Sequence, residues 1–208
     1  MTTKLVQQAR VRTNITKDSV CNVNVEAVTF AKLWSNYARG EPYRDPKTGD
    51  VPPGFENQCA IQVSVTLHRV GIEMKSFNGQ GKILLDGKRT AIRAKELAEW
   101  LKRQPFCGLP PRPENITGTD WQNKIKDRTG IVFFSDYWAR PGQAAANADG
   151  DHIDLWNKKT LTPSLQSFIR FYIGRSSVFS LRSILGNQDD YWMSDLGKSK
   201  EILFWEIK

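Results

Sequence analysis

The stretch that decides the fold begins at Cys59, ends at Val70 and reads CAIQVSVTLHRV. Its apolar residues recur at helical spacing on two faces, with Cys59, Val63, Leu67 and Val70 on one face and Ile61 and Val65 on the other. A helix that is apolar on two faces belongs in the middle of a fold, with other elements packed around it. The sequence therefore predicts a buried central helix that begins at a cysteine.

Two further segments have apolar residues at helical spacing. In residues 25–38 (VEAVTFAKLWSNYA) the expected buried side consists of Val28, Leu33 and Trp34. In residues 93–102 (RAKELAEWLK) the apolar side carries Leu97 and Leu101.

Strand patterns follow the helices, in residues 131–135 (IVFFS), 152–156 (HIDLW), 178–184 and 201–207. Loop-rich stretches separate these elements at residues 40–58, 104–120 and 139–151. Helices first and strands afterwards are typical of an α+β fold with an antiparallel sheet. The length of 208 residues suits one domain, so we expect residues 1–208 to form a single domain.

Composition excludes several classes of protein. With 39% hydrophobic and 25% charged residues, the chain lies outside the range of disordered proteins. No apolar run reaches the ~18 residues of a membrane span, and the first residues lack the apolar region of a signal peptide. We expect a globular protein that is made in the cytoplasm and has no membrane partner.

The net charge of +8 favours an anionic partner, which could be nucleic acid, a membrane surface or a cell-wall polymer. The basic residues are dispersed, with short runs only at Lys88–Arg89, 124–128 and Lys158–Lys159. No nucleic-acid-binding motif accompanies them. We therefore expect no nucleic-acid partner, and a basic nucleic-acid-binding module is the alternative function.

Few residues are available for chemistry. The cysteines are Cys21, Cys59 and Cys107, too few for a disulfide framework, and a bridge between Cys21 and Cys107 is left open. The two histidines, His68 and His152, cannot build a three-imidazole metal site.

Cys59 stands where a loop meets the central helix, and the free N–H groups of a helix start stabilise a thiolate. A cysteine there can equally be a small buried hydrophobic residue. A nucleophilic thiol needs a base, and His68 lies ~13 Å farther along the same helix on the opposite face. His152 begins a strand after a flexible loop and is the candidate base.

Residues of a strand alternate between its faces, so His152, Asp154 and Trp156 are predicted on one face and Ile153 and Leu155 on the other. Polar groups on one face and aliphatic groups on the other indicate a site beside a core.

Two sequence segments resemble motifs of a known protein family. Residues 55–64 (FENQCAIQVS) are similar to the F-x-N-x-C-x-I-[RQ]-x-S segment of the type VI secretion amidase effectors, family four, and residues 150–157 (GDHIDLWN) to its G-H-x-x-L-W-N segment. The helix at 93–101 and the strand at 130–132 match in the same order. The resemblance covers about residues 54–157.

The resemblance implies a papain-like (NlpC/P60-like) fold, in which the helix that bears the nucleophile packs on an antiparallel sheet and residues 158–208 complete the same domain. It implies a peptidoglycan amidase, a DL-endopeptidase that hydrolyses the bond between D-glutamate and meso-diaminopimelate in the peptide stem. No metal and no organic cofactor is expected for this reaction. Cys59 is then the nucleophile and His152 the base. A papain-like enzyme that acts on another amide, such as a protein deamidase, is a further alternative.

The resemblance also implies partners and a place of action. The expected partners are peptidoglycan stems, a cognate immunity protein and the type VI secretion apparatus. Such a toxin leaves the cytoplasm without a signal peptide and acts in the periplasm of a target cell.

The third catalytic residue is left open. The position that corresponds to the family's aspartate is Pro163 here. Asp154 is favoured because it shares a strand face with His152, and the other candidates are Asn157, Asp189, Asp190 and Asp195. For the oxyanion hole we expect the N–H of Cys59, with Gln58 or Asn57 as a second donor.

Overall fold

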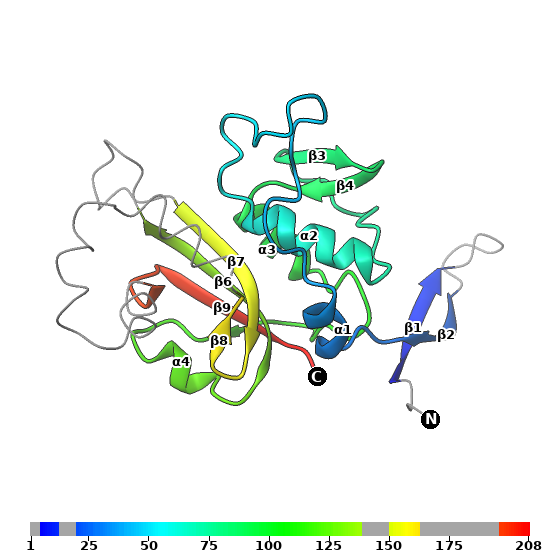
Figure 1. Cartoon of the computed structure of the whole chain (residues 1–208). Coiled ribbons are helices and arrows are strands. Elements are labelled where there is room, and N and C mark those ends of the chain that lie inside the picture. Colours follow the sequence, from blue (N-terminus) through cyan, green and yellow to red (C-terminus); the bar gives the residue numbers. More distant parts are fainter. Residues whose placement is uncertain (1–4, 13–19, 139–149, 163–195) are drawn as a thin grey trace.

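A five-stranded antiparallel sheet holds the C-terminal half of the chain together (Figure 1). Its strands are β5 (Glu114–Asn115), β6 (Thr129–Trp138), β7 (Gly150–Asn157), β8 (Thr160–Leu161) and β9 (Glu201–Glu206), in the order β5-β9-β6-β7-β8. The structure is a computed structural model that describes residues 5–12, 20–138, 150–162 and 196–208.

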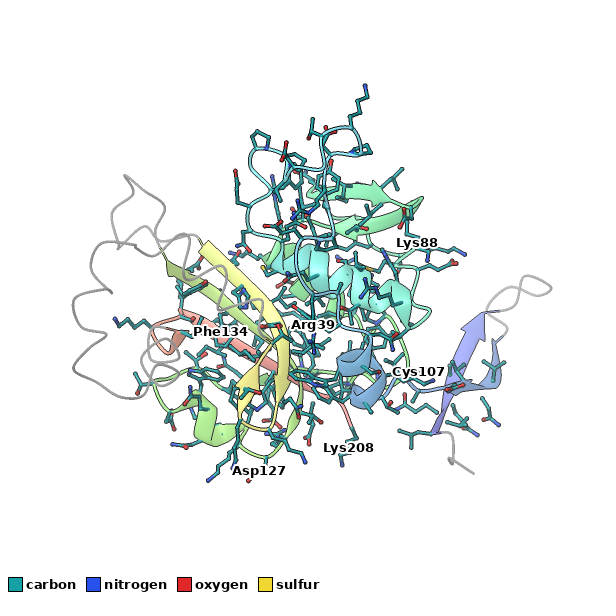
Figure 2. All side chains as sticks on the ribbon, in the orientation of Figure 1. Arg39, Lys88, Cys107, Asp127, Phe134 and Lys208 are labelled. Carbon is teal, nitrogen blue, oxygen red and sulfur yellow. The ribbon has the colours of Figure 1, made fainter. Side chains whose placement is uncertain are left out.

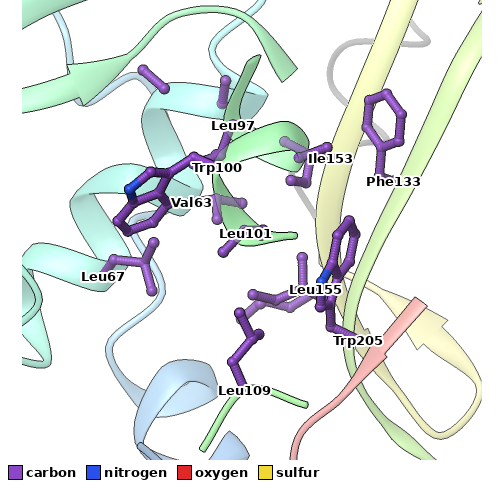
Figure 3. Close-up of a cluster of buried hydrophobic side chains, with 14 of the residues drawn as sticks. Val63, Leu67, Leu97, Trp100, Leu101, Leu109, Phe133, Ile153, Leu155 and Trp205 are labelled. Carbon is purple, nitrogen blue, oxygen red and sulfur yellow. The ribbon is translucent and has the colours of Figure 1, made fainter. Parts of the chain in front are cut away.

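Two helices cover one face of this sheet, α2 (Cys59–Arg69) and α3 (Ala94–Leu101). Figure 3 shows side chains of both helices meeting Ile153 and Leu155 of β7 and Trp205 of β9. As predicted, Leu97 and Leu101 are buried on α3. On α2, Cys59, Ile61, Val63 and Leu67 are buried as the two-faced pattern predicted, whereas Val65 and Val70 are only half-buried.

The other face of the sheet is also buried, against the short helix α4 (Trp121–Lys124) and its neighbours. Val132 and Phe134 of β6 and Phe204 of β9 point to this side, whereas Ile131 and Phe133 point to the helices α2 and α3. A strand that is buried on both faces reads as a continuous apolar run, which explains the sequence IVFF.

Polar side chains of α2 hold the elements around it. The hydroxyl of Ser64 accepts a hydrogen bond from the N–H of Ala91 at 3.2 Å, and the hydroxyl of Thr66 accepts one from the N–H of Ala38 at 3.0 Å. Helix α2 is thereby fixed on the sides that do not face the sheet.

The prediction of one helix over residues 25–38 is wrong in its first part. Residues up to Glu26 belong to strand β2 (Val20–Glu26), which pairs with β1 (Val6–Arg12), and α1 runs only over Phe30–Ser35. The hydroxyl of Thr29 caps α1 by accepting a hydrogen bond from the N–H of Lys32 at 3.4 Å. Figure 1 shows the β1–β2 hairpin extending away from the rest of the fold.

A second hairpin, β3 (Lys82–Leu85) and β4 (Lys88–Ala91), was not predicted. Its turn is Asp86-Gly87, and both residues have positive φ, 51° and 73°. Asp-Gly between two strands is a strong hairpin signal, so this hairpin could have been predicted from the sequence.

The strand predicted at 201–207 is confirmed as β9, and the strands at 131–135 and 152–156 are parts of the longer β6 and β7. The strand predicted at 178–184 and most of the loop at 139–151 lie outside the described residues. In the described ranges, no helix has the length and apolar character that a membrane span requires.

Gly130 on β6 provides a test of this packing. A Cβ atom there would overlap the carbonyl oxygen of Trp205 and lie 2.8 Å from the ring of Phe204. We expect Gly130→Ala to lower the free energy of unfolding by about 2 to 3 kcal/mol, because overpacking a tight core forces its surroundings to shift.

Gly87→Ala is the control, since its Cβ meets nothing within 4 Å and only its positive φ opposes the change. Its cost should be about 1 kcal/mol. Urea unfolding of both variants decides the point, and equal losses would show that the contact between β6 and β9 is not tight.

Candidate active site

Cys59 is the first residue of α2 and is 6% exposed. Its N–H donates a hydrogen bond to the side-chain oxygen of Asn57 at 3.3 Å. Gln58, the N-cap residue, makes no side-chain bond to the helix. The thiol therefore lies at a helix start, as the sequence predicted.

The side chain of Gln58 bonds to the loop that precedes α2. Its side-chain oxygen accepts a hydrogen bond from the N–H of Tyr43 at 2.8 Å, and its amide nitrogen donates one to the carbonyl of Tyr43 at 2.7 Å. One turn further along the helix, the amide of Gln62 donates a hydrogen bond to the carbonyl of Gly40. These two glutamines fasten the loop of residues 40–58 to the first turn of α2.

Strand β7 brings His152 to the same place. Among the described strands, β7 is the outermost of the sheet at His152, because β8 pairs only with Trp156 and Asn157. Helix α2 contacts β7. The imidazole stacks on the ring of Phe134 in β6, with 6.3 Å between ring centroids and 25° between planes. Phe134 lies within the sheet (Figure 2).

The predicted alternation along β7 is confirmed for its apolar residues. Ile153 and Leu155 belong to the cluster under α2 and α3, whereas Trp156 belongs to the cluster on the other face. The indole N–H of Trp156 donates a hydrogen bond to the carbonyl of Ile125 at 2.9 Å, which ties the strand to α4.

Asp154 lies close to the imidazole. Its Oδ2 is 3.7 Å from Nε2 of His152, and both side chains are buried, at 0% and 1% exposure. The hydroxyl of Thr162 donates a hydrogen bond to Oδ1 at 2.5 Å, its N–H donates one to Oδ2 at 3.2 Å, and the N–H of Leu155 donates one to Oδ1 at 2.7 Å. Three donors thus hold a buried carboxylate next to the histidine.

The environment of His152 favours the charged imidazolium. Burial lowers its pKa, but the carboxylate of Asp154 and then the sulfur of Cys59 raise it, and the resulting pKa is about 9. Opposite charges nearby outweigh the loss of water. The carboxylate of Asp154 and the sulfur of Cys59 therefore both act on the imidazole of His152.

The other candidates are elsewhere. His68 shares a hydrogen bond between its Nε2 and the carbonyl of Arg89 at 3.1 Å, and burial lowers its pKa. Asn157 pairs with Thr129 and Thr160 at the opposite end of β7 from His152. Asp189, Asp190 and Asp195 lie outside the described residues.

Cys107 is a half-buried free thiol near α1 (Figure 2), where its carbonyl accepts a hydrogen bond from the N–H of Val28 at 2.9 Å. The side chain of Cys21, the other half of the bridge that the sequence left open, lies outside the described part of the structure. Among the described residues, no group of three His, Cys, Asp or Glu side chains could hold a metal ion.

Two residues of this site were missed in the sequence. Thr162 holds Asp154 from the residue after β8, and only the pairing of β7 with β8 brings it there. Tyr137 on β6 lies near enough to Cys59 and Asp151 for their charges to raise its pKa, after the larger effect of burial. Tyr137 lies within an irregularity in the pairing of β6 with β7, between Phe134 and Trp138, that no sequence pattern predicts.

A thiol, an imidazole and a buried carboxylate at the meeting of a helix start and a strand are typical of hydrolases that use a thiol nucleophile. Residues 55–205 match the model of the family described as type VI secretion system (T6SS), amidase effector protein 4 (Tae4). The chain belongs to this family of antibacterial peptidoglycan hydrolases. No curated protein matches it.

Solved structures of similar proteins include Tae4 from Enterobacter cloacae, with 16% sequence identity, a TM-score of 0.48 and coverage of 86% of this chain and 96% of that one. The complex of Tae4 with Tai4 from Salmonella typhimurium, an effector–immunity system, has 20% identity and a TM-score of 0.48 and covers 67% and 87%.

The bond from Thr162 to Asp154 leads to a stability test. Thr162→Val keeps the shape of the side chain but removes one donor to a buried carboxylate. We expect a loss of about 2 kcal/mol in the free energy of unfolding, the cost of leaving a charged acceptor short of a partner. Thr162→Ser keeps the hydroxyl and should lose less than half as much. If the valine variant is as stable as the wild type in urea, the hydroxyl does not hold Asp154.

The raised pKa of His152 predicts how stability depends on pH. A histidine whose pKa rises from 6.5 to about 9 on folding stabilises the fold fully below pH 6.5 and loses this effect as the pH rises through 9. The effect amounts to about 3 kcal/mol.

Urea unfolding of the wild type and of His152→Gln from pH 6 to pH 10 measures it. The difference in free energy of unfolding between them should shrink over this range. A constant difference would mean that His152 keeps an ordinary pKa in the fold.

Proposed function

We propose that the protein is a cysteine-dependent peptidoglycan amidase, a DL-endopeptidase with a single papain-like (NlpC/P60-like) domain. Cys59 is the nucleophile, His152 the acid and base, and Asp154 the residue that orients the imidazole. The observation that carries the proposal is the position of His152, whose pKa responds to both the sulfur of Cys59 and the carboxylate of Asp154.

The first half of the reaction forms an acyl-enzyme. The sulfur of Cys59, as thiolate, attacks the carbonyl carbon of the amide, and the carbonyl oxygen takes the negative charge. The C–N bond then breaks, and the imidazolium of His152 gives its proton to the amine that leaves. A pKa of about 9 means that His152 carries this proton at neutral pH.

The second half regenerates the enzyme. The neutral imidazole takes a proton from a water molecule, whose oxygen attacks the thioester carbon. The C–S bond breaks, and the products are the free carboxyl group and the Cys59 thiolate beside the imidazolium. Asp154 stabilises this imidazolium in each half, because its buried carboxylate supplies the opposite charge.

The proposed substrate is the peptide stem, cut between D-glutamate and meso-diaminopimelate. This bond follows from the resemblance of residues 55–64 and 150–157 to the family's motifs. The proposed partners are the type VI secretion apparatus and a cognate immunity protein, as in the effector–immunity complexes of the similar Tae4 proteins. The protein is made in the cytoplasm and acts in the periplasm of a target cell.

Cys59→Ala tests the nucleophile. Purified wild-type protein incubated with muropeptides that contain meso-diaminopimelate should release disaccharide fragments ending in D-glutamate, identified by chromatography and mass spectrometry. The alanine variant should lose at least ~10³-fold in kcat, because no other group can take over the attack.

Cys107→Ala is the matched control, since Cys107 is the other described free thiol and lies near α1. It should keep activity within about twofold. Hydrolysis by Cys59→Ala at the wild-type rate would refute the nucleophile, and products cut at another amide would refute the substrate.

A further inference from the structure

Four buried side-chain polar atoms have no hydrogen-bond partner in the described part of the chain. They are Oη of Tyr137, Nδ1 and Nε2 of His152, and Nε1 of Trp205. Three of the four atoms belong to the two residues whose pKa responds to Cys59. Nε2 of His152 faces the carboxylate of Asp154 at 3.7 Å, whereas the hydroxyl of Tyr137 has no partner among the described residues. Buried polar groups are almost always paired in native proteins, so this hydroxyl indicates a place for a ligand.

The backbone positions Tyr137 through an irregularity in the sheet. Phe134 pairs with His152 and Trp138 with Gly150, so three residues of β6 stand opposite Asp151 alone. A bulge of this kind redirects side chains and is frequent beside active sites. It places Tyr137 next to the strand segment that carries His152.

The bulge is fastened by Asp136 and Asp151. Asp136 has a φ of 49°, in the left-handed region that non-glycine residues rarely adopt. Its N–H donates a hydrogen bond to Oδ1 of Asp151 at 3.1 Å. Since a strained backbone persists only where surrounding contacts maintain it, this bond supports the bulge.

The hydroxyl of Tyr137 can only be a donor toward an anion here. Burial, and then the charges of Cys59 and Asp151, raise its pKa well above 10. The phenol therefore keeps its proton throughout the pH range in which an enzyme works. A neutral donor close to a nucleophilic sulfur is the group that an oxyanion requires.

The other groups expected to donate hydrogen bonds to the oxyanion already form hydrogen bonds within the protein. The N–H of Cys59 already donates to Asn57, at the long distance of 3.3 Å, and the amide of Gln58 bonds to the main chain of Tyr43. The oxyanion of the tetrahedral intermediate needs a further hydrogen-bond donor. The hydroxyl of Tyr137, which has no partner among the described residues, can be that donor.

We propose that Tyr137 is a catalytic residue, whose hydroxyl donates a hydrogen bond to the carbonyl oxygen of the scissile amide as that oxygen becomes an oxyanion. The proposal rests on Cys59 being the nucleophile of an amidase. In the resting enzyme the hydroxyl has no partner among the described residues, and the substrate provides one.

Tyr137→Phe tests this by removing only the hydroxyl. We expect kcat on muropeptides to fall ~10²-fold or more with KM unchanged, which is the effect of losing an interaction made in the transition state. A stem-peptide aldehyde, whose adduct with a thiol carries a similar oxygen, should bind the variant more weakly by a comparable factor. The thermal midpoint should stay the same or rise, because a buried hydroxyl without a partner is lost.

Tyr37→Phe is the matched control. Its hydroxyl donates a hydrogen bond to the side-chain oxygen of Gln62 at 3.3 Å. This variant should lose stability and keep kcat within about threefold, the opposite of the result expected for Tyr137→Phe.

Two results would overturn the inference. An unchanged kcat for Tyr137→Phe, or a change in KM alone, excludes the oxyanion contact while leaving the amidase intact, provided that Cys59→Ala is inactive. If Cys59→Ala is as active as the wild type, the proposed function fails, and the role of Tyr137 fails with it.

Discussion

The packing of α2 against β7 is the constraint on which the rest of the structure depends. A helix that is apolar on two faces cannot stay at the surface, so the sheet must cover one side while β4 and the segment after α1 bond to its polar residues on others. Once Val63 and Leu67 lie against the cluster that contains Ile153 and Leu155, the start of α2 comes close to the start of β7. The thiol and the imidazole meet because the core packs in this way.

The charges of the site are balanced within the core. Placing an imidazolium out of contact with water is costly, and a buried carboxylate alone is costly too. Together they offset each other, provided that the carboxylate has enough donors, which the side chain and N–H of Thr162 supply. The overall charge of +8 plays no part in this balance and fits instead with a wall polymer whose stems carry carboxylates.

The sequence predicted the elements whose pattern is local. Each of these patterns lies within one continuous segment. They are the two apolar faces of α2, the apolar face of α3, the apolar run of β6 and the alternation of β7. Cys59 and His152 could be chosen as candidates because the sequence has only three thiols and two imidazoles.

What escaped prediction depends on pairing between distant residues. The segment 25–29 has apolar spacing compatible with a helix, but Val25 pairs with Gln7 in the β1–β2 hairpin. Thr162 reaches Asp154 only after the chain turns from β7 into β8, and Tyr137 depends on a bulge. Propensity and periodicity describe one segment at a time, so such contacts are invisible to them.

The anchoring of the loop 40–58 has a consequence for how the family can diversify. The side chains of Gln58 and Gln62 form hydrogen bonds with main-chain groups of Tyr43 and Gly40, not with their side chains. The bond to a backbone carbonyl or N–H survives a change in the side chain of the residue that offers it. The loop of residues 40–58 can therefore change its side chains while the start of α2 keeps its geometry, so the surface of this loop can evolve independently of the position of Cys59.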